Sequence, residues 1–115
     1  QLIIPYLFSE FYIKEHVPLS TLIKLTSENP ARRFGLFPQK GSLHIGTDAD
    51  FTIIDPSSSF PVVEVELKSK GKYSPFRGKT FSCSVDKTIV RGETVFDCKM
   101  GLLVKSGFGK WIRRN

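Results

Sequence analysis

Residues 28–56, which read ENPARRFGLFPQKGSLHIGTDADFTIIDP, constrain the fold more than any other stretch of the chain. Asn29 followed by Pro30 is typical of the first turn of a helix. The asparagine side chain accepts from a free backbone amide there, and proline lacks an amide that would have no partner. Gly35 suits the left-handed conformation that ends a helix, and Pro38 prevents continuation. The sequence therefore predicts a short helix between Pro30 and Gly35, followed by a forced turn.

Two turns and two strands are expected in the rest of this stretch. A glycine-containing turn at residues 39–41 leads to a short strand over residues 42–45. A second turn at residues 46–48 leads to a strand over residues 49–55, which the following proline ends. The stretch is thus predicted to form a helix and then a hairpin.

The composition is that of a globular domain, because 40% of the 115 residues are hydrophobic and 24% are charged. No apolar run is long enough to cross a membrane, and no charged and then apolar signal peptide is present, so a cytoplasmic protein without a membrane partner is expected. The chain begins with Gln1, and its only methionine is Met100. Because translated chains begin with methionine, a piece of a longer polypeptide is expected.

The two cysteines, Cys83 and Cys98, have neither the spacing of a zinc knuckle nor that of a disulfide framework. They are expected to be free thiols, buried or half-buried. The net charge of +6 comes from the second half of the chain, where residues 57–115 hold twelve basic and five acidic residues. These basic residues mostly alternate with apolar or small ones, as on the solvated face of a sheet, so nucleic-acid binding by a basic β domain is a weaker alternative.

Helices are expected before the central stretch. Apolar residues at helical spacing predict a helix from about Pro5 to Lys14, too apolar to stand alone. A second helix is expected to begin near Pro18, with Ser20 as its N-cap. His16, between the two, is expected at the surface or in a cap.

Short strands are expected after the central stretch. Residues 60–67 alternate in polarity, which predicts a strand that buries Val63, Val65 and Leu67. Further strands are expected over residues 80–85, 87–90 and 102–105, with a hairpin turn at Arg91, Gly92 and Glu93. In the basic tail, Trp111 and Ile112 are expected to anchor the chain to the body of the domain.

Three sequence elements together resemble the cyclic amidohydrolases, the family of dihydroorotase, hydantoinase (dihydropyrimidinase) and allantoinase. They are NPARRFGL followed by KGSLHIGTDADFTIIDP, then KYSPFRGK, then TIVRGETVF, in the order and spacing of that family. Each of the motif residues in these elements also has a structural explanation as a cap or turn residue, so the motif is interpreted as scaffold. Its residues are Asn29, Pro30, Ala31, Arg32, Gly35, Gly41, Gly46, Asp48, Asp50, Pro75, Gly78 and Gly92.

The resemblance implies an α+β fragment with two parts. Residues 1–40 would be closing helices of a TIM-type (β/α)8 barrel and the junction after it. Residues 41–115 would be the C-terminal strands of a small composite β-sandwich that other parts of the polypeptide complete. The implied partners are the remainder of the amidohydrolase chain and further copies of the complete enzyme as a homo-oligomer.

The family hydrolyses a ring amide with water activated by zinc or another divalent metal, but the ligand pattern of the family is not recognisable here. There is no His-x-His pair, and His16 and His44 stand in unrelated contexts. Asp48, Asp50 and Asp55 are expected to bond to nearby backbone amides rather than to a metal. We therefore expect no catalytic residue and no metal ligand in this chain, which alone would be inactive.

The resemblance leaves the substrate open. The tail LVKSGFGKWIRR looks more like that of dihydroorotases, which favours a dihydroorotase of pyrimidine biosynthesis. A hydantoinase or allantoinase, or a non-catalytic homologue with degenerate metal ligands, remains an alternative.

Overall fold

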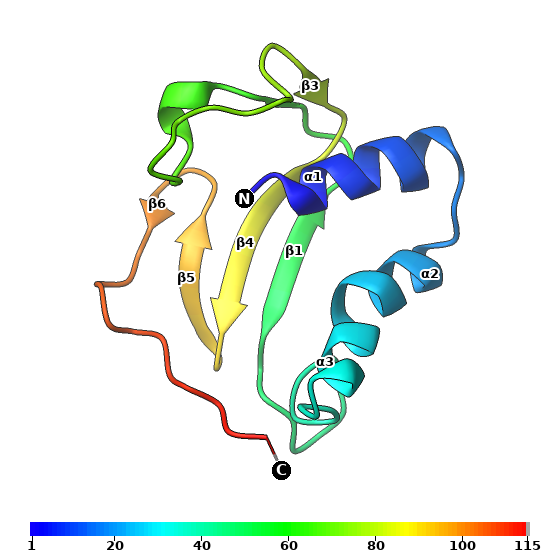
Figure 1. The fold of residues 1–115 in the computed structure, drawn as a ribbon, viewed down its shortest axis with the longest axis vertical. Coiled ribbons are helices and arrows are strands. Elements are labelled where there is room, and N and C mark those ends of the chain that lie inside the picture. Colours follow the sequence, from blue (N-terminus) through cyan, green and yellow to red (C-terminus); the bar gives the residue numbers. More distant parts are fainter. Residues whose placement is uncertain (115) are drawn as a thin grey trace. The chain divides into compact units, whose positions relative to one another are not determined.

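The computed structural model describes residues 1–114 and has α+β content (Figure 1). The chain forms two compact units, and each is built from two separate segments. The first unit comprises Gln1–Val17 and Ile54–Val85, and the second comprises Pro18–Ile53 and Asp86–Asn115. The division at residue 40 expected from the resemblance concerns the complete protein and stays a prediction. In the part that the structure describes, no helix is both long and apolar enough to span a membrane.

The first unit begins with the expected N-terminal helix. It consists of α1 (Ile3–Leu7) and the π-helical segment η1 (Phe8–Lys14), so it starts two residues earlier than predicted. Two short strands, β2 (Phe60–Pro61) and β3 (Thr80–Phe81), pair in antiparallel fashion in this unit. Its buried residues include Phe8, Val62, Leu67, Phe81 and Cys83.

The strand predicted over residues 60–67 is wrong beyond Pro61. A 3₁₀ turn, η3 (Glu64–Glu66), replaces it, because the Glu64 carboxylate accepts a hydrogen bond from the Ser74 amide, 2.9 Å away. The buried positions are consequently Val62 and Leu67, whereas Val65 is 78% exposed. A period-2 pattern in the sequence does not require a strand when a side chain draws the backbone into a turn.

The second unit contains one helical run from Leu19 to Arg33. It comprises α2 (Leu19–Ile23), the π-helical segment η2 (Lys24–Glu28) and α3 (Asn29–Arg33), which follow one another without a break. The predicted N-cap roles of Ser20 and Asn29 are both wrong. Ser20 lies inside α2, whose N-cap is Pro18, and Asn29 has helical φ and ψ and is preceded by helix.

A wide helical turn explains how Pro30 fits into this run. Proline lacks the amide that would bond four residues back, and its ring crowds the carbonyl there. The Asn29 amide instead donates five residues back, to the Lys24 carbonyl, which is the bonding pattern of a π-bulge. Pro30 therefore marks a widened turn inside a helix rather than the start of a new one.

Four strands form one sheet in the order β1-β4-β5-β6 (Figure 1). They are β1 (Phe51–Asp55), β4 (Ser84–Val90), β5 (Glu93–Asp97) and β6 (Gly101–Leu102). The strand predicted at 49–55 is therefore confirmed over five residues, and the 102–105 strand is confirmed only at its start. β4 and β5 pair in antiparallel fashion with a bulge near Thr88 and Ile89.

The strand predicted over residues 42–45 is wrong. The Thr47 hydroxyl donates to the His44 carbonyl at 2.7 Å, and the Thr47 amide donates to the same carbonyl at 3.2 Å. These local bonds hold a turn in place of a ladder. Ile45 is fully exposed, so no buried face selects a strand here.

Candidate functional site

The predicted helix end lies at Gly35. Its amide donates to the Arg32 carbonyl at 3.2 Å, and the Leu36 amide donates to the Ala31 carbonyl at 2.8 Å. This pair of bonds is the Schellman pattern, which requires a left-handed residue after the last helical turn. Gly35 has φ +68°, so it has the left-handed conformation predicted for the residue that ends the helix.

Gly41 has a second role that the turn prediction did not include. It has φ +77°, and a Cβ at this position would lie 2.7 Å from the Ala31 Cβ and 2.9 Å from the Ser27 carbonyl oxygen. Ala31 is 6% exposed. The loop thus touches the helix at a point where neither residue has room for a larger side chain.

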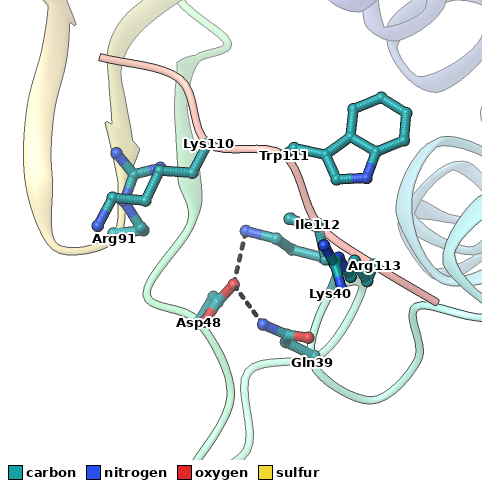
Figure 2. A pocket seen from close by; sticks show the side chains of 8 residues that line it. All are labelled: Gln39, Lys40, Asp48, Arg91, Lys110, Trp111, Ile112 and Arg113. Atoms are coloured by element: carbon teal, nitrogen blue, oxygen red, sulfur yellow. Dashed lines mark hydrogen bonds and ion pairs between the residues drawn. The ribbon is translucent and has the colours of Figure 1, made fainter. Parts of the chain in front are cut away.

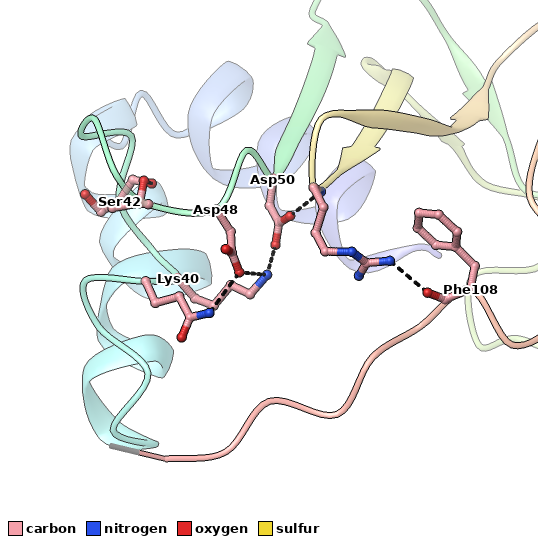
Figure 3. A network of polar contacts seen from close by, with 8 residues as sticks. Lys40, Ser42, Asp48, Asp50 and Phe108 are labelled. Atoms are coloured by element: carbon pink, nitrogen blue, oxygen red, sulfur yellow. Dashed lines mark hydrogen bonds and ion pairs between the residues drawn. The ribbon is translucent and has the colours of Figure 1, made fainter.

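Lys40, next to this contact, is held between two carboxylates (Figure 3). Its Nζ lies 2.8 Å from Asp48 Oδ2 and forms a second ion pair with Asp50. Partial burial works to lower the pKa of Lys40, but the hydrogen bonds to Asp48 and Asp50 outweigh it and raise that pKa above its ordinary value. Asp48 and Asp50 were expected to bond to nearby backbone amides, but both carboxylates pair with the Lys40 side chain.

Asp50 also joins this loop to the β4–β5 hairpin. Its Oδ1 accepts from the Arg91 amide at 2.8 Å, and the Gly92 amide donates to the Ala49 carbonyl at 2.8 Å. Burial works to raise the pKa of Asp50, but the bonds from Lys40 and from the Arg91 amide outweigh it, so that pKa is lowered. Arg91 and Gly92 have φ 51° and 78°, as in a type I′ turn, which confirms the predicted hairpin.

The Arg91 side chain extends from this turn to the C-terminal tail. Its Nη2 donates to the Phe108 carbonyl at 2.8 Å, and its guanidinium carbon lies 4.5 Å from the centre of the Phe108 ring (Figure 3). A hydrogen bond and a cation–π contact to one residue fix the guanidinium group in place. Arg91 is thus the residue that ties the tail to the hairpin.

A pocket of about 260 Å³ lies beside these groups (Figure 2). Eight residues line it: Gln39, Lys40, Asp48, Arg91, Lys110, Trp111, Ile112 and Arg113. Four of them are basic and one is acidic. In Figure 2 the Lys40 side chain reaches toward Asp48. The prediction that Trp111 anchors the tail is wrong, because it is 90% exposed.

The remaining motif residues lie at turns or on the helix surface. Pro75 begins the turn that Gly78 ends with φ +74°, and Gly46 has φ +93° in the loop before Asp48. Arg32 pairs with Glu28 at 2.9 Å, one helical turn away. These placements agree with structural roles. That the motif residues act only as scaffold in the complete protein stays a prediction.

No group of three or more His, Cys, Asp or Glu side chains within residues 1–114 is arranged to hold a metal ion. Asp55 accepts from the amide and the hydroxyl of Ser57, as expected of a turn aspartate. Cys83 is buried, and Cys98 is exposed, which corrects the expectation for Cys98. Both thiols are free, as predicted.

The sequence reading missed the basic lining of the pocket. Arg91 and Lys40 were each assigned only to a turn, at residues 91–93 and 39–41. The signal was the clustering of basic residues at Lys110 and Arg113 in a tail that carries no acidic residue. Which earlier residues face that tail depends on the hairpin and on the Phe108 contact.

The family model of the amidohydrolase family matches residues 7–95. The chain belongs to the amidohydrolase family. Its relatives include a D-phenylhydantoinase from Escherichia coli, which is 41% identical over 108 residues. That match covers 94% of this chain and 23% of the relative, so the chain spans about a quarter of the length of the curated relatives it matches.

Solved structures of hydantoinases have the same fold over nearly the whole chain. L-hydantoinase (dihydropyrimidinase) from Arthrobacter aurescens superposes with a TM-score of 0.90 at 36% identity, covering 96% of this chain and 24% of that one. D-hydantoinase (dihydropyrimidinase) from Thermus sp. has a TM-score of 0.89 at 24% identity, with the same coverage. At that identity the second match shows the fold alone.

These comparisons correct the preference for a dihydroorotase, because the named relatives are hydantoinases. The preference was based on the tail. Its residue Trp111 lies almost fully in solvent, and the remainder of the tail is without helix or strand beyond Leu102 in the described residues. Segments without regular structure vary readily in sequence among related proteins, so the tail is a weak guide to the substrate class.

Proposed function

We propose that these 115 residues are the C-terminal part of a hydantoinase-type cyclic amidohydrolase, which hydrolyses the amide C–N bond of a cyclic substrate. The observation that carries the proposal is the 41% identity to D-phenylhydantoinase over 94% of the chain. The TM-score of 0.90 with an L-hydantoinase supports it. Allantoinase, and a homologue of the same fold without activity, are the alternatives.

The proposed architecture follows the family. Residues 1–40 would be closing helices of a (β/α)8 barrel, and residues 41–115 would supply strands to a composite β-sandwich. Large apolar side chains that are exposed in these residues support this assignment, because monomeric proteins rarely leave so many uncovered. They include Ile3 at 64%, Leu25 at 59%, Phe34 at 62%, Leu43 at 77% and Ile45 at full exposure. We propose that the remainder of the polypeptide covers them.

The chemistry of the complete enzyme is assigned to residues outside this chain. In the family, zinc or another divalent metal lowers the pKa of the attacking water. The described residues do not fit such an ion, since they contain no group of three metal-ligating side chains. No catalytic step is therefore assigned to them, and their proposed contribution is structural.

The structural contribution has a definite form in the second unit. The ion pairs of Lys40 with Asp48 and Asp50 join two positions of one loop, and Asp50 joins that loop to the hairpin through the Arg91 amide. Gly41 fixes the same loop against the helix at Ala31. We propose that this arrangement holds the helical run and the sheet of this unit in one geometry.

The test is an assay of the complete protein, loaded with zinc, on four rings: 5-phenylhydantoin, dihydrouracil, allantoin and dihydroorotate. We expect ring opening of the hydantoin and of dihydrouracil, and its loss when the metal is removed by a chelator. Turnover of dihydroorotate alone would contradict the hydantoinase assignment. No turnover of any ring, together with missing metal ligands in the rest of the sequence, would favour the inactive homologue.

We propose a homo-oligomer of the complete enzyme in the cytoplasm, without a membrane or nucleic-acid partner. Size-exclusion chromatography with light scattering measures the oligomeric state. A binding titration against generic DNA at low salt tests the nucleic-acid alternative, which requires affinity that falls steeply as salt rises.

A further inference from the structure

The pocket beside the tail carries more positive charge than its acidic residues neutralise. Of the four basic residues that line it, Lys40 is paired with Asp48 and Asp50. Arg91, Lys110 and Arg113 form no ion pair with another described residue. Three cations thus line a pocket of about 260 Å³ without forming an ion pair within residues 1–114.

One of these cations is held rigidly. The Arg91 guanidinium is fixed by its bond to the Phe108 carbonyl and by its position over the Phe108 ring. Arginine has five N–H donors, so the single bond to Phe108 leaves others for a further partner. Because its position is already fixed, little side-chain freedom would be lost on binding, which favours affinity.

The second cation lines the same pocket, where Lys110 comes from the tail and Arg91 from the hairpin (Figure 2). Like charges repel, and an anion between them removes that repulsion and gains charge-assisted hydrogen bonds. The tail residues Lys110 and Arg113 lie three positions apart and line the same pocket.

The pocket is open to solvent on one side and, at about 260 Å³, has room for a small ion. The side chains that line it offer donors rather than acceptors, apart from Asp48 and Gln39, which are bonded to each other at 3.3 Å. The ligand class that matches is a small oxyanion with several acceptor oxygens.

We propose that this pocket is a binding site for a small oxyanion of the phosphate class, held by Arg91, Lys110 and Arg113. The proposal does not depend on the hydantoinase assignment, since the groups that carry it belong to this chain. An acidic side chain from another part of the protein offers the same chemistry, and the experiment below separates the two sources.

The experiment titrates the complete protein with inorganic phosphate at constant ionic strength and follows tryptophan fluorescence. Trp111 lines the pocket and is the only tryptophan of this chain, so the signal is taken as the difference between the wild type and Trp111→Phe. We expect a saturable change. We expect Lys110→Ala with Arg113→Ala to weaken phosphate binding by about a hundredfold, since each of the two lost charge-assisted contacts is worth roughly tenfold.

The matched control is Lys99→Ala with Lys105→Ala. It also removes two positive charges from the C-terminal part of the chain, but both residues are exposed and lie outside the pocket. The proposal requires the control to keep nearly the wild-type affinity. Equal weakening by both pairs means general charge attraction and overturns the site. A wild type without a saturable phosphate response also overturns it and points to an acidic side chain of the protein in the pocket.

Discussion

Gly41 lies directly against Ala31, so close that a methyl group on Gly41 would come within 2.7 Å of the Ala31 side chain. The two residues lie ten positions apart in the motif that identifies the family. Gly41 also has φ +77°, which side chains other than glycine adopt with strain. The contact explains in physical terms why this turn is built on glycine and why the facing helix residue is small.

Gly41→Ala is expected to destabilise the protein by about 2–4 kcal/mol, since it adds overpacking against the helix to strain at positive φ. Gly46→Ala is the matched control. Gly46 also has positive φ, but nothing lies within 4 Å of its added Cβ, so about 1 kcal/mol is expected. Urea unfolding of both variants measures the difference. Equal destabilisation would mean that the contact with Ala31 contributes nothing.

The ion pair between Lys40 and Asp50 is expected to give a pH-dependent stability. The pKa of Asp50 is lowered in the fold, so its contribution is present above the unfolded-state pKa of about 3.9 and is lost as pH falls through the folded-state value. The pKa of Lys40 is raised, so its contribution is present below about 10.4 and is lost as pH rises through the folded-state value.

Asp50→Asn tests this linkage. The free energy of unfolding, measured from pH 3 to pH 7, is expected to rise less steeply with pH in the variant than in the wild type. The reason is that the variant lacks the Asp50 carboxyl group, whose pKa is lowered in the fold. Glu15→Gln is the control, since the exposed Glu15 carboxylate forms no ion pair with another described residue. If Asp50→Asn left the acid limb unchanged, the Lys40 ion pair would not contribute to stability.

Arg91→Ala is expected to release the tail. The variant loses both the hydrogen bond to the Phe108 carbonyl and the contact with the Phe108 ring. Trypsin should then cleave after Lys105 and Lys110 several times faster, because cleavage requires an extended, mobile backbone. Arg77→Ala is the control, since the Arg77 side chain is 81% exposed and pairs only with Glu64. Unchanged cleavage in Arg91→Ala would show that other contacts hold the tail.

The two thiols are expected to react differently with a thiol reagent. Cys83 is fully buried, and burial raises its pKa, so it should react only on unfolding. Cys98 is exposed and should react in the folded protein, but slowly, because its hydrogen bond with Asp86 raises its pKa. Asp86→Asn should speed this reaction. Mass spectrometry of labelled peptides, with Cys98→Ser as the blank, assigns each thiol.

Local sequence signals determined the positions of the backbone reversals. Gly35 ends the helix, Arg91 and Gly92 form the hairpin turn, and Pro56 follows the last residue of β1. Each of these depends on the φ that one or two residues can adopt, which no distant contact changes. The family resemblance rests on such turn and cap residues, and the match to the amidohydrolase family confirms it.

Tertiary structure decided which residues these turns bring together. In the sequence Asn29 looks like a helix N-cap. In the structure it lies within the helical run, because its amide bonds to the carbonyl five residues back, and no local sequence pattern predicts that bond. The alternation at residues 62–67 gave way to a 3₁₀ turn held by the contact between Glu64 and Ser74. The β-propensity of a short segment has a weak effect compared with one contact to a buried or charged partner.

The basic pocket is the clearest case. By itself the sequence determined that the chain has the scaffold motif of the amidohydrolases and an excess of positive charge late in the chain. Only the tertiary structure decided that Lys40 is neutralised by Asp48 and Asp50, whereas Arg91 and Lys110 line the same pocket without an ion pair to another described residue. The reason is physical: electrostatic interaction depends on distance in space, and residues 40, 91 and 110 become neighbours only when the loop, the hairpin and the tail have folded.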